Sequence, residues 1–341
     1  MTTRALPAET SSTDWLLFGL LGLFWGSSYL FIKIGVETLP TFTLIAGRLG
    51  IGALLLGVVL FVAREPLPRE LRTYGQLVVL ALISIVIPFT LITWGERSID
   101  SALASILNST VPLFTIVLAA LVLHDEPITV NRLVGLAVGF GGVVIVTSRS
   151  LGGASQSDLL GELAMIGSSV SYACGSVYAR RVVGGLRPMV PAFLQVAIAF
   201  LITAALAVGT EDPSTIALRP EAVFSVIWLG VFGSGLAYLV WFRLLRDWGS
   251  TRTTLVAYLL PVVGISLGVI VLGEVVDARI LAGTALIIGG IALVNSRFGA
   301  RRLYGRAPAP AGASPVPAGA ASPPAGAPPP TRAGPETSGT D

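Results

Sequence analysis

The sequence is short of charge, cysteine and histidine. Asp, Glu, Lys and Arg together make up 12% of its 341 residues, about half of the roughly 25% found in soluble globular proteins. The single cysteine, Cys174, permits no internal disulfide and no cysteine-rich metal site. The single histidine, His124, stands beside Asp125 and Glu126 in a run that indicates a solvated loop. We therefore predict no metal and no cofactor.

The sequence motifs of zinc peptidases and of nucleotide-binding loops are also missing. The sequence contains no His-Glu-x-x-His pair and no Gly-x-x-x-x-Gly-Lys phosphate loop. The formal net charge of +3 comes from arginines spread among short segments, a pattern more typical of membrane topology than of nucleic-acid binding. These absences argue against a zinc peptidase, an ATP-driven pump and a nucleic-acid partner.

Apolar residues are abundant instead. They make up 53% of the chain, and the mean hydropathy is +0.82, so the chain is predicted to be an integral membrane protein. About 20 apolar residues are needed for a helix to cross the hydrocarbon core. Such stretches predict an all-α bundle of ten transmembrane helices, at residues 15–35, 41–63, 74–94, 101–122, 131–148, 160–180, 190–209, 221–243, 253–272 and 279–296.

The basic residues predict how these helices are oriented. With the N-terminus in the cytoplasm, 16 of the 22 Lys and Arg residues fall in inner segments and four in outer loops, while Lys33 and Arg48 lie within spans. By the positive-inside rule, both termini are predicted to be cytoplasmic. Residues 307–341 contain ten prolines among alanine, glycine and serine, a composition typical of a disordered tail.

An internal repeat divides the apolar part of the chain. Residues 126–149 align without gaps onto residues 274–297, with nine identities in 24 positions. Because each repeat holds five predicted spans, the second enters the membrane from the opposite side, as in many secondary transporters. We predict a cytoplasmic N-terminus, two five-helix repeats, and a basic stub with the tail, at residues 1–14, 15–149, 150–297 and 298–341.

Individual residues of the first repeat follow a known pattern. They are the run Trp25-Gly26-Ser27-Ser28-Tyr29, then Lys33, Arg48, Pro112, and Glu126 leading to Gly135 and Gly141-Gly142. With them the chain resembles the EamA type of the drug/metabolite transporter superfamily, over residues 15–297. The resemblance implies ten spans, a bacterial inner membrane, and export or exchange of small metabolites, often amino acids or related amphipathic compounds. The second repeat lacks the Trp-Gly pair and the arginine.

Arg48 is the most informative single residue. It lies roughly 12 Å along its predicted helix, where an arginine costs at least about 2.5–3.5 kcal/mol. It is either a structural residue bonded to backbone or the counter-charge for a substrate carboxylate. Trp25, Tyr29 and Lys33 are spaced to share one helix face, which favours a wet cavity, although a lysine stem also reaches headgroups easily.

Further polar and aromatic residues lie in the predicted spans. An unpaired amide in hydrocarbon costs several kcal/mol, so Asn108 and Gln195 either contact substrate or bond to a neighbouring helix. The same alternatives apply to the tyrosines at mid-span, Tyr172, Tyr178, Tyr238 and Tyr258. Prolines interrupt helical hydrogen bonding and are predicted either as hinges or as fixed kinks, at Pro88, Pro112 and Pro261.

No acidic residue lies at the centre of a predicted span. Since an embedded acid is the usual proton relay of a carrier, the sequence favours uniport or exchange, with coupling through Glu96 as the alternative. We predict a secondary transporter of the inner membrane that moves a small amphipathic metabolite, an amino-acid-like compound or a drug, by alternating access. A non-transporting scaffold and a lipid-acting membrane enzyme are the alternatives. The predicted partners are a small-molecule substrate and the bilayer, with the oligomeric state left open.

Overall fold

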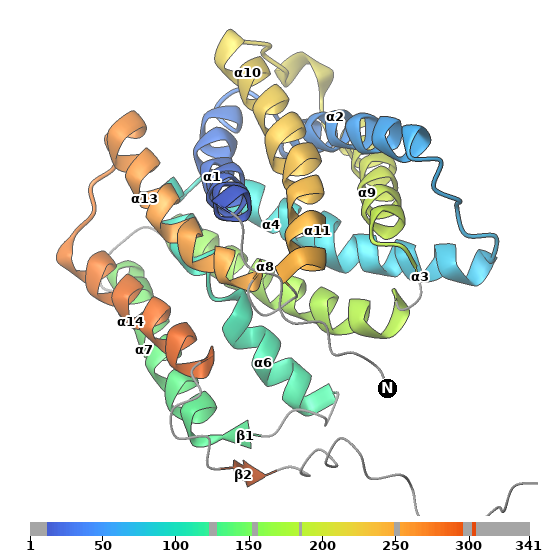
Figure 1. Cartoon of the computed structure of the whole chain (residues 1–341). Coiled ribbons are helices and arrows are strands. Elements are labelled where there is room, and N and C mark those ends of the chain that lie inside the picture. Colours follow the sequence, from blue (N-terminus) through green and yellow to red (C-terminus); the bar gives the residue numbers. More distant parts are fainter. Residues whose placement is uncertain are drawn as a thin grey trace, which may run out of the picture. The chain divides into compact units, whose positions relative to one another are not determined.

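The computed structural model describes residues 12–122, 128–151, 156–183, 186–248, 253–295 and 302–304. The predicted tail and the run His124-Asp125-Glu126 lie outside these ranges. Long helices connected by short segments make up most of the described chain (Figure 1). The helices of its first half are α1 (Ser12–Gly35), α2 (Thr41–Val62), α3 (Leu71–Ala81), α4 (Ile87–Gly95), α5 (Ser101–Asn108), α6 (Val111–Val122) and α7 (Val130–Leu151).

The second half continues in the same way. Its helices are α8 (Gln156–Val182), α9 (Met189–Thr210), α10 (Pro220–Trp228), α11 (Ala237–Trp248), α13 (Leu259–Leu272) and α14 (Ala278–Asn295). A short 3-10 turn, η2 (Pro213–Thr215), lies between α9 and α10. One two-stranded antiparallel pair, β1 (Ile128–Thr129) with β2 (Arg302–Tyr304), departs from the purely helical prediction.

Eight helical segments of the described chain are long and apolar enough to cross a membrane. They are 12–35, 41–62, 71–95, 101–122, 130–148, 189–210, 220–244 and 255–272. Of the other two predicted spans, α14 has a shorter apolar stretch, Ala278–Val294, and α8 carries five serines and four charged residues over its 27 residues. The chain is therefore a multi-pass helical membrane protein.

Two of these segments are interrupted by π-helical turns. The first, η1 (Leu82–Val86), joins α3 to α4, and the second, η3 (Leu229–Leu236), joins α10 to α11. In a π turn the carbonyl of residue i accepts from the N–H of residue i+5. For Ile83 that residue is Pro88, which has no N–H, and the Ile83 carbonyl instead accepts a hydrogen bond of 2.7 Å from Ser171 Oγ.

The predicted span 101–122 is not one continuous helix. It is broken at Ser109 and Thr110, between α5 and α6. The carbonyl of Leu107 accepts from the N–H of Thr110 at 3.2 Å and from its hydroxyl at 2.6 Å. In the second half, a 3-10 turn, η4 (Thr254–Tyr258), precedes α13. The fourth predicted span of each repeat is thus irregular.

Helices from the two halves pack against each other in matching pairs. α2 lies along α9 and α7 along α14, while α1 contacts α13 and α6 contacts α8. The α7–α14 contact is backbone to backbone (Figure 1). A Cβ at Gly290 would lie 2.6 Å from the Gly135 carbonyl oxygen, and one at Gly142 would lie 2.6 Å from the Gly283 carbonyl oxygen.

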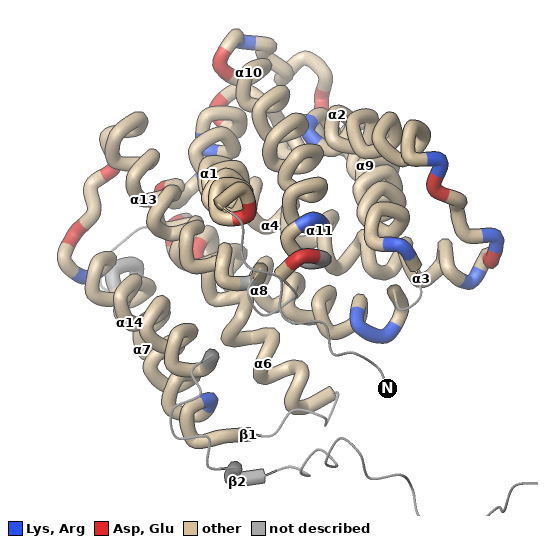
Figure 2. The backbone as a smooth tube through the Cα atoms, viewed as in Figure 1, with Lys and Arg blue, Asp and Glu red and all other residues tan. Residues whose placement is uncertain are grey.

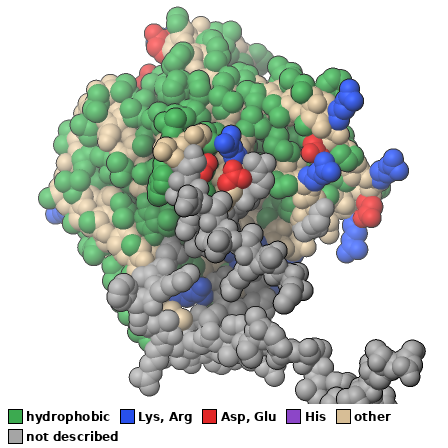
Figure 3. All heavy atoms as spheres, in the orientation of Figure 1, with side chains coloured by type: hydrophobic (Ala, Val, Ile, Leu, Met, Phe, Trp, Pro, Cys, Tyr) green, Lys and Arg blue, Asp and Glu red, His purple; other side chains and the backbone are tan. Residues whose placement is uncertain are grey.

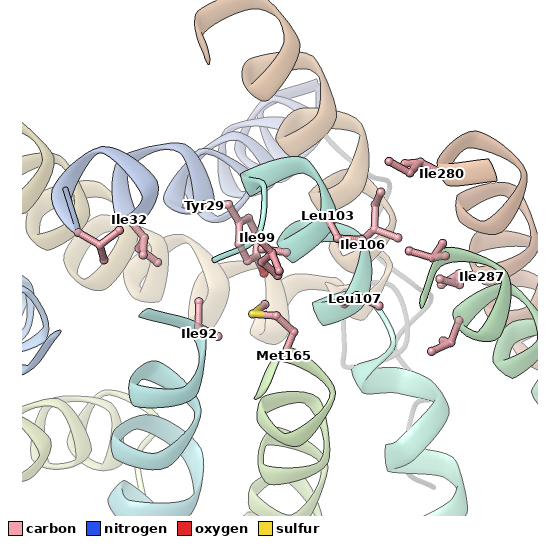
Figure 4. Packing of buried hydrophobic residues seen from close by; sticks show 14 of the residues in the cluster. Tyr29, Ile32, Ile92, Ile99, Leu103, Ile106, Leu107, Met165, Ile280 and Ile287 are labelled. Atoms are coloured by element: carbon pink, nitrogen blue, oxygen red, sulfur yellow. The ribbon is translucent and has the colours of Figure 1, made fainter. Parts of the chain in front are cut away.

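Apolar side chains fill the interior and also cover the outside. The largest buried cluster joins α1, α5, α8 and the α7–α14 pair, and Figure 4 shows Tyr29, Ile99, Leu103 and Met165 turned toward one another within it. Hydrophobic side chains dominate the face in Figure 3, as a bilayer requires. Charged residues gather at helix ends and connections (Figure 2).

Candidate substrate-binding site

Arg48 is buried in the middle of α2, with 4% of its surface exposed. Its Nε donates a hydrogen bond of 3.2 Å to Ser234 Oγ of η3, and its guanidinium carbon lies 4.4 Å from the centre of the Phe89 ring. The second contact is a cation–π interaction by its distance. A guanidinium has five N–H donors, and Ser234 is the only hydrogen-bond partner that the described residues give this side chain.

The π turn η3 makes room for the guanidinium. A Cβ at Gly233 would lie 3.1 Å from both Arg48 Nη2 and Ser28 Oγ, so only glycine leaves this space open. Ser234 and Phe89 were not among the predicted site residues. The three glycines within residues 230–235 were the available signal, since clustered glycines often mark a close approach to another group.

A second polar group joins α1, α5 and α8. Asn108 Nδ2 donates a hydrogen bond of 2.6 Å to Tyr29 Oη, and Asn108 Oδ1 accepts from Ser168 Oγ at 3.2 Å and Ser169 Oγ at 3.4 Å. Both Tyr29 and Asn108 are buried. The amide that the sequence marked as costly in lipid thus has partners on two other helices.

Aromatic residues border this region. Trp25 of α1 packs near Tyr238 of α11, with 6.5 Å between ring centres. Tyr29, Tyr172 and Tyr238 lie within electrostatic range of Arg48. The structure therefore brings together Arg48, Tyr29, Asn108, Tyr172, Tyr238 and Trp25 from the predicted set.

Lys33 lies apart from Arg48, at the end of α1. Its Nζ donates to the carbonyl oxygens of Glu96 at 2.8 Å and Ile99 at 2.7 Å. The nearby Glu274 accepts hydrogen bonds from the backbone N–H groups of Ser101 at 2.8 Å and Ala102 at 2.9 Å. We call this region, formed by residues 33–43, 95–102, 211–217 and 273–277, the Lys33 end.

Three predicted site residues lie elsewhere or bond within their own helix. Tyr178 packs in a separate cluster with residues of α2, α3 and α9. Gln195 Nε2 donates to the Pro191 carbonyl, four residues back in α9, at 3.0 Å. Tyr258 ends η4 and packs against the large cluster of Tyr29.

Each predicted hinge proline follows an irregular turn. Pro88 comes two residues after η1, Pro112 is the second residue of α6, and Pro261 is the third residue of α13. A proline is tolerated at the start of a helix because its missing N–H has no partner there. The prolines thus mark where regular helix resumes.

One serine motif of hydrolases occurs in the chain by spacing alone. Gly264, Ser266 and Gly268 match Gly-x-Ser-x-Gly, but all three lie within α13, whereas a nucleophile elbow joins a strand to a helix. The Ser266 hydroxyl donates to the Val262 carbonyl at 2.7 Å. This segment therefore has the geometry of an ordinary helix.

Comparison with known proteins gives the family. The EamA-like transporter family matches residues 13–148 and again residues 159–296. The uncharacterized transporter YvbV of Bacillus subtilis is 28% identical, covering 84% of this chain and 93% of that protein. The uncharacterized inner membrane transporter YedA of Escherichia coli is also 28% identical, covering 82% and 90%.

A further relative has a more specific name. The probable amino-acid metabolite efflux pump of Salmonella typhimurium is 27% identical, covering 86% of this chain and 98% of that protein. A crystal structure 20% identical in sequence superposes with a TM-score of 0.60, covering 83% of this chain and 96% of the other, and so shares the fold. The chain belongs to the EamA-like transporter family, and the names of the family and of these relatives indicate a membrane transporter.

Proposed function

We propose that the protein exports or exchanges a small amphipathic metabolite across the bacterial inner membrane by alternating access, with both termini in the cytoplasm. The observation that carries the proposal is Arg48, a buried cation with no acidic partner among the described residues. Such a group favours an anionic ligand in the same low-dielectric surroundings. A carboxylate on the substrate is the fitting charge.

Two inverted repeats of five spans are part of the proposal, as the basis of alternating access. The π turns η1 and η3 begin at Leu82 and Leu229, 147 residues apart, close to the offset of the sequence repeat. The glycine contacts of α7 and α14 are reciprocal: Gly135 meets Gly290, and Gly142 meets Gly283. With α8 and α14 counted as spans, the chain has ten.

The side chains around Arg48 and the name of one relative support the proposed class of substrate. Tyr29, Tyr172, Tyr238 and Trp25 offer apolar ring faces with polar tips, which suit an amphipathic molecule. Asn108 adds an amide that can both donate and accept. A relative named as an amino-acid metabolite efflux pump agrees with an amino-acid-like compound that carries a carboxylate.

The test is metabolite profiling of the growth medium of cells that express the wild-type chain or Arg48→Ala. We expect at least one carboxylate-bearing metabolite to accumulate with the wild type and to fall to the background level with Arg48→Ala, while the amount of protein in the membrane is unchanged. Arg48→Lys keeps the charge without the planar fork, so partial export is expected. Export that survives Arg48→Ala would refute the role of Arg48.

Removal of residues 307–341 separates a transporter from a scaffold. Transport by the truncated chain should equal that of the full chain, because the proposed site uses none of these residues. If truncation abolished the cellular effect while no metabolite moved with either chain, the scaffold alternative would replace the proposal.

A further inference from the structure

Glu96 is a fully buried acid that the proposed substrate site does not use. It follows directly after the apolar segment Leu71–Gly95, with 0% of its surface exposed. Within the described residues neither carboxylate oxygen has a hydrogen-bond partner. Buried polar atoms are nearly always hydrogen-bonded, so two such oxygens on one carboxyl group call for a reason.

An ion pair with Lys33 would be the simplest explanation for a buried carboxyl group at Glu96, but the hydrogen bonds of Lys33 exclude it. Lys33 lies close enough for an ion pair to be expected, but its Nζ donates to the carbonyl oxygens of Glu96 and Ile99 instead of to the carboxylate. Glu274 is held by the N–H groups of Ser101 and Ala102. Among the residues that the structure describes, the Glu96 carboxyl group therefore has charged neighbours but no hydrogen-bond donor.

The charged and titratable groups around Glu96 come from several elements. On its own connection are Arg97, which donates to the Leu39 carbonyl at 3.1 Å, and Asp100 at the start of α5. The other elements packed nearby contribute Lys33 and Tyr29 on α1, Arg48 on α2 and Glu274 before α14, and α8 contributes Glu162, which follows Gly161 where that residue packs against Gly95.

A buried carboxylate without donors is unstable as an ion, and the usual outcome is that it takes up a proton. Burial away from water raises the pKa of the Glu96 carboxyl well above its usual range; Lys33 opposes this, Glu274 reinforces it and Arg48 opposes it. Ile92 and Ile99, four residues before and three residues after Glu96, belong to the buried cluster of Figure 4, and the Glu96 side chain is itself fully buried.

We propose that Glu96 is the proton-binding site of this transporter: its carboxyl group carries a proton while the Lys33 end is packed as described, and releases it when that end opens to water. The proposal rests on the proposed function, since opening and closing are parts of the transport cycle. In the step one O–H bond of the neutral acid breaks, the electron pair stays on the carboxylate, and the proton passes to water. The proposal takes the alternative of coupling through Glu96 in place of the expected uniport or exchange, which rested on the lack of an acid in span centres.

The sign of the pH dependence follows from linkage. The packed Lys33 end binds the extra proton, so lowering the pH at that end stabilises the packed state and raising it favours the open state. One linked proton can change this balance by at most about tenfold per pH unit. The wild-type transport rate should therefore vary with pH, by several-fold across the neutral range.

The first experiment detects the proton itself and needs no substrate. Infrared difference spectra of the purified full chain in lipid nanodiscs are recorded over a series of pH values. We expect a carbonyl band of a protonated carboxyl group in the wild type and its loss in Glu96→Gln. Glu65→Gln, a change at an acid in an exposed ion pair, is the matched control and should keep the band.

Glu96→Asp covers the case in which Glu96→Gln does not fold. It keeps a carboxyl group at this position, so it should show the band at a shifted frequency. An unchanged band in Glu96→Gln, or an unshifted one in folded Glu96→Asp, would assign the proton to another residue and overturn the proposal.

The second experiment links the proton to transport. Proteoliposomes take up a radiolabelled mixture of the twenty standard amino acids, by counterflow at equal pH on both sides and then with a pH gradient. We expect the gradient to change wild-type and Glu65→Gln uptake several-fold and to leave Glu96→Gln uptake at its gradient-free value.

Wild-type counterflow without any effect of the gradient would overturn the proton site and leave the proposed function intact. An absence of counterflow for every amino acid would count against the proposed amino-acid substrate, while the infrared band would still decide the proton site.

Discussion

The two ends of the helix bundle are held together by different kinds of contact. At the Lys33 end, charged side chains bond to backbone groups of other helices and of the connections between them. At the other end, where α2 finishes and α9 begins, the charged contacts are exposed: charged side chains meet other charged side chains, and Arg181 donates to the Val122 carbonyl at 2.9 Å. We call this second region, formed by residues 62–70, 180–183, 186–189 and 243–248, the Arg187 end.

At the Lys33 end, four charged side chains of the described residues bond to backbone groups. Glu211 accepts from the backbone N–H groups of Phe42 at 2.6 Å and Thr43 at 2.8 Å, so it caps the start of α2. Glu274 caps the start of α5 in the same way. Lys33 and Arg97 donate to carbonyl oxygens. Each carboxylate belongs to the second half of the chain and each capped helix to the first.

The Arg187 end has weaker pairs. Glu65 Oε2 lies 2.7 Å from Arg187 Nη1, but the arginine side chain is 69% exposed. Arg243 and Asp247 are 3.8 Å apart on the same helix. Exposed ion pairs of this kind are worth about 0–1 kcal/mol. The charged contacts of the Lys33 end are therefore the stronger of the two sets, and we expect the Arg187 end to open at lower cost.

The largest effect should come from Glu274→Ala. It leaves the N–H groups of Ser101 and Ala102 without their charged acceptor, and hydrogen bonds to charged groups are worth about 1.5–3 kcal/mol each. We expect the apparent unfolding temperature of the purified protein in detergent to fall by several degrees. Glu274→Gln, which keeps one acceptor oxygen, should fall in between. An unchanged unfolding temperature in both variants would show that this cap contributes nothing to closure.

Lys33→Met should have an intermediate effect. Methionine keeps much of the apolar stem but loses both hydrogen bonds to the carbonyls of Glu96 and Ile99, and because the side chain is half-buried we expect a loss of about 1–2 kcal/mol. Lys33→Arg keeps the donors and is the control. Thermal unfolding measures the loss, and equal values for the two variants would contradict the role of the ammonium group.

The smallest effect should come from Glu65→Ala. The ion pair with Arg187 is exposed and screened by salt, so a loss below about 1 kcal/mol is expected. Unfolding measured at low and at high salt provides the check: the difference between Glu65→Ala and the wild type should shrink as salt rises. A loss as large as that of Glu274→Ala would remove the distinction between the two ends.

The sequence predicted the fold well where apolar length decides it. The boundaries of α1, α2 and α9 fall within about three residues of the predicted spans. Hydropathy could not predict the break at Ser109–Thr110 or the π turns, because both depend on partners from other helices, such as Ser171 for the Ile83 carbonyl.

The charged and amide residues of the site were predictable from the sequence, but the residues that contact them were not. Arg48 and Asn108 are conspicuous because an arginine or an amide in an apolar stretch is costly, whereas Ser234 and Phe89 are ordinary residues of a span. Lys33 is a residue that the sequence pattern favoured too strongly. Its type and spacing fit a binding face, but its ammonium group donates to two backbone carbonyl oxygens. Burial of Glu96 likewise depends on how α4, α5 and α1 meet.

The contact between α7 and α14 has a consequence for how such a chain could arise. Gly135 and Gly283 occupy equivalent places in the two halves, as do Gly142 and Gly290. Gly135 meets Gly290, the counterpart of Gly142, and Gly142 meets Gly283, the counterpart of Gly135. This is the self-complementary arrangement of an isologous dimer interface. A single five-helix half would therefore display, on its last helix, a surface that fits a second copy of itself. Joining two such copies end to end in one gene would turn a dimer contact into the internal seam described here.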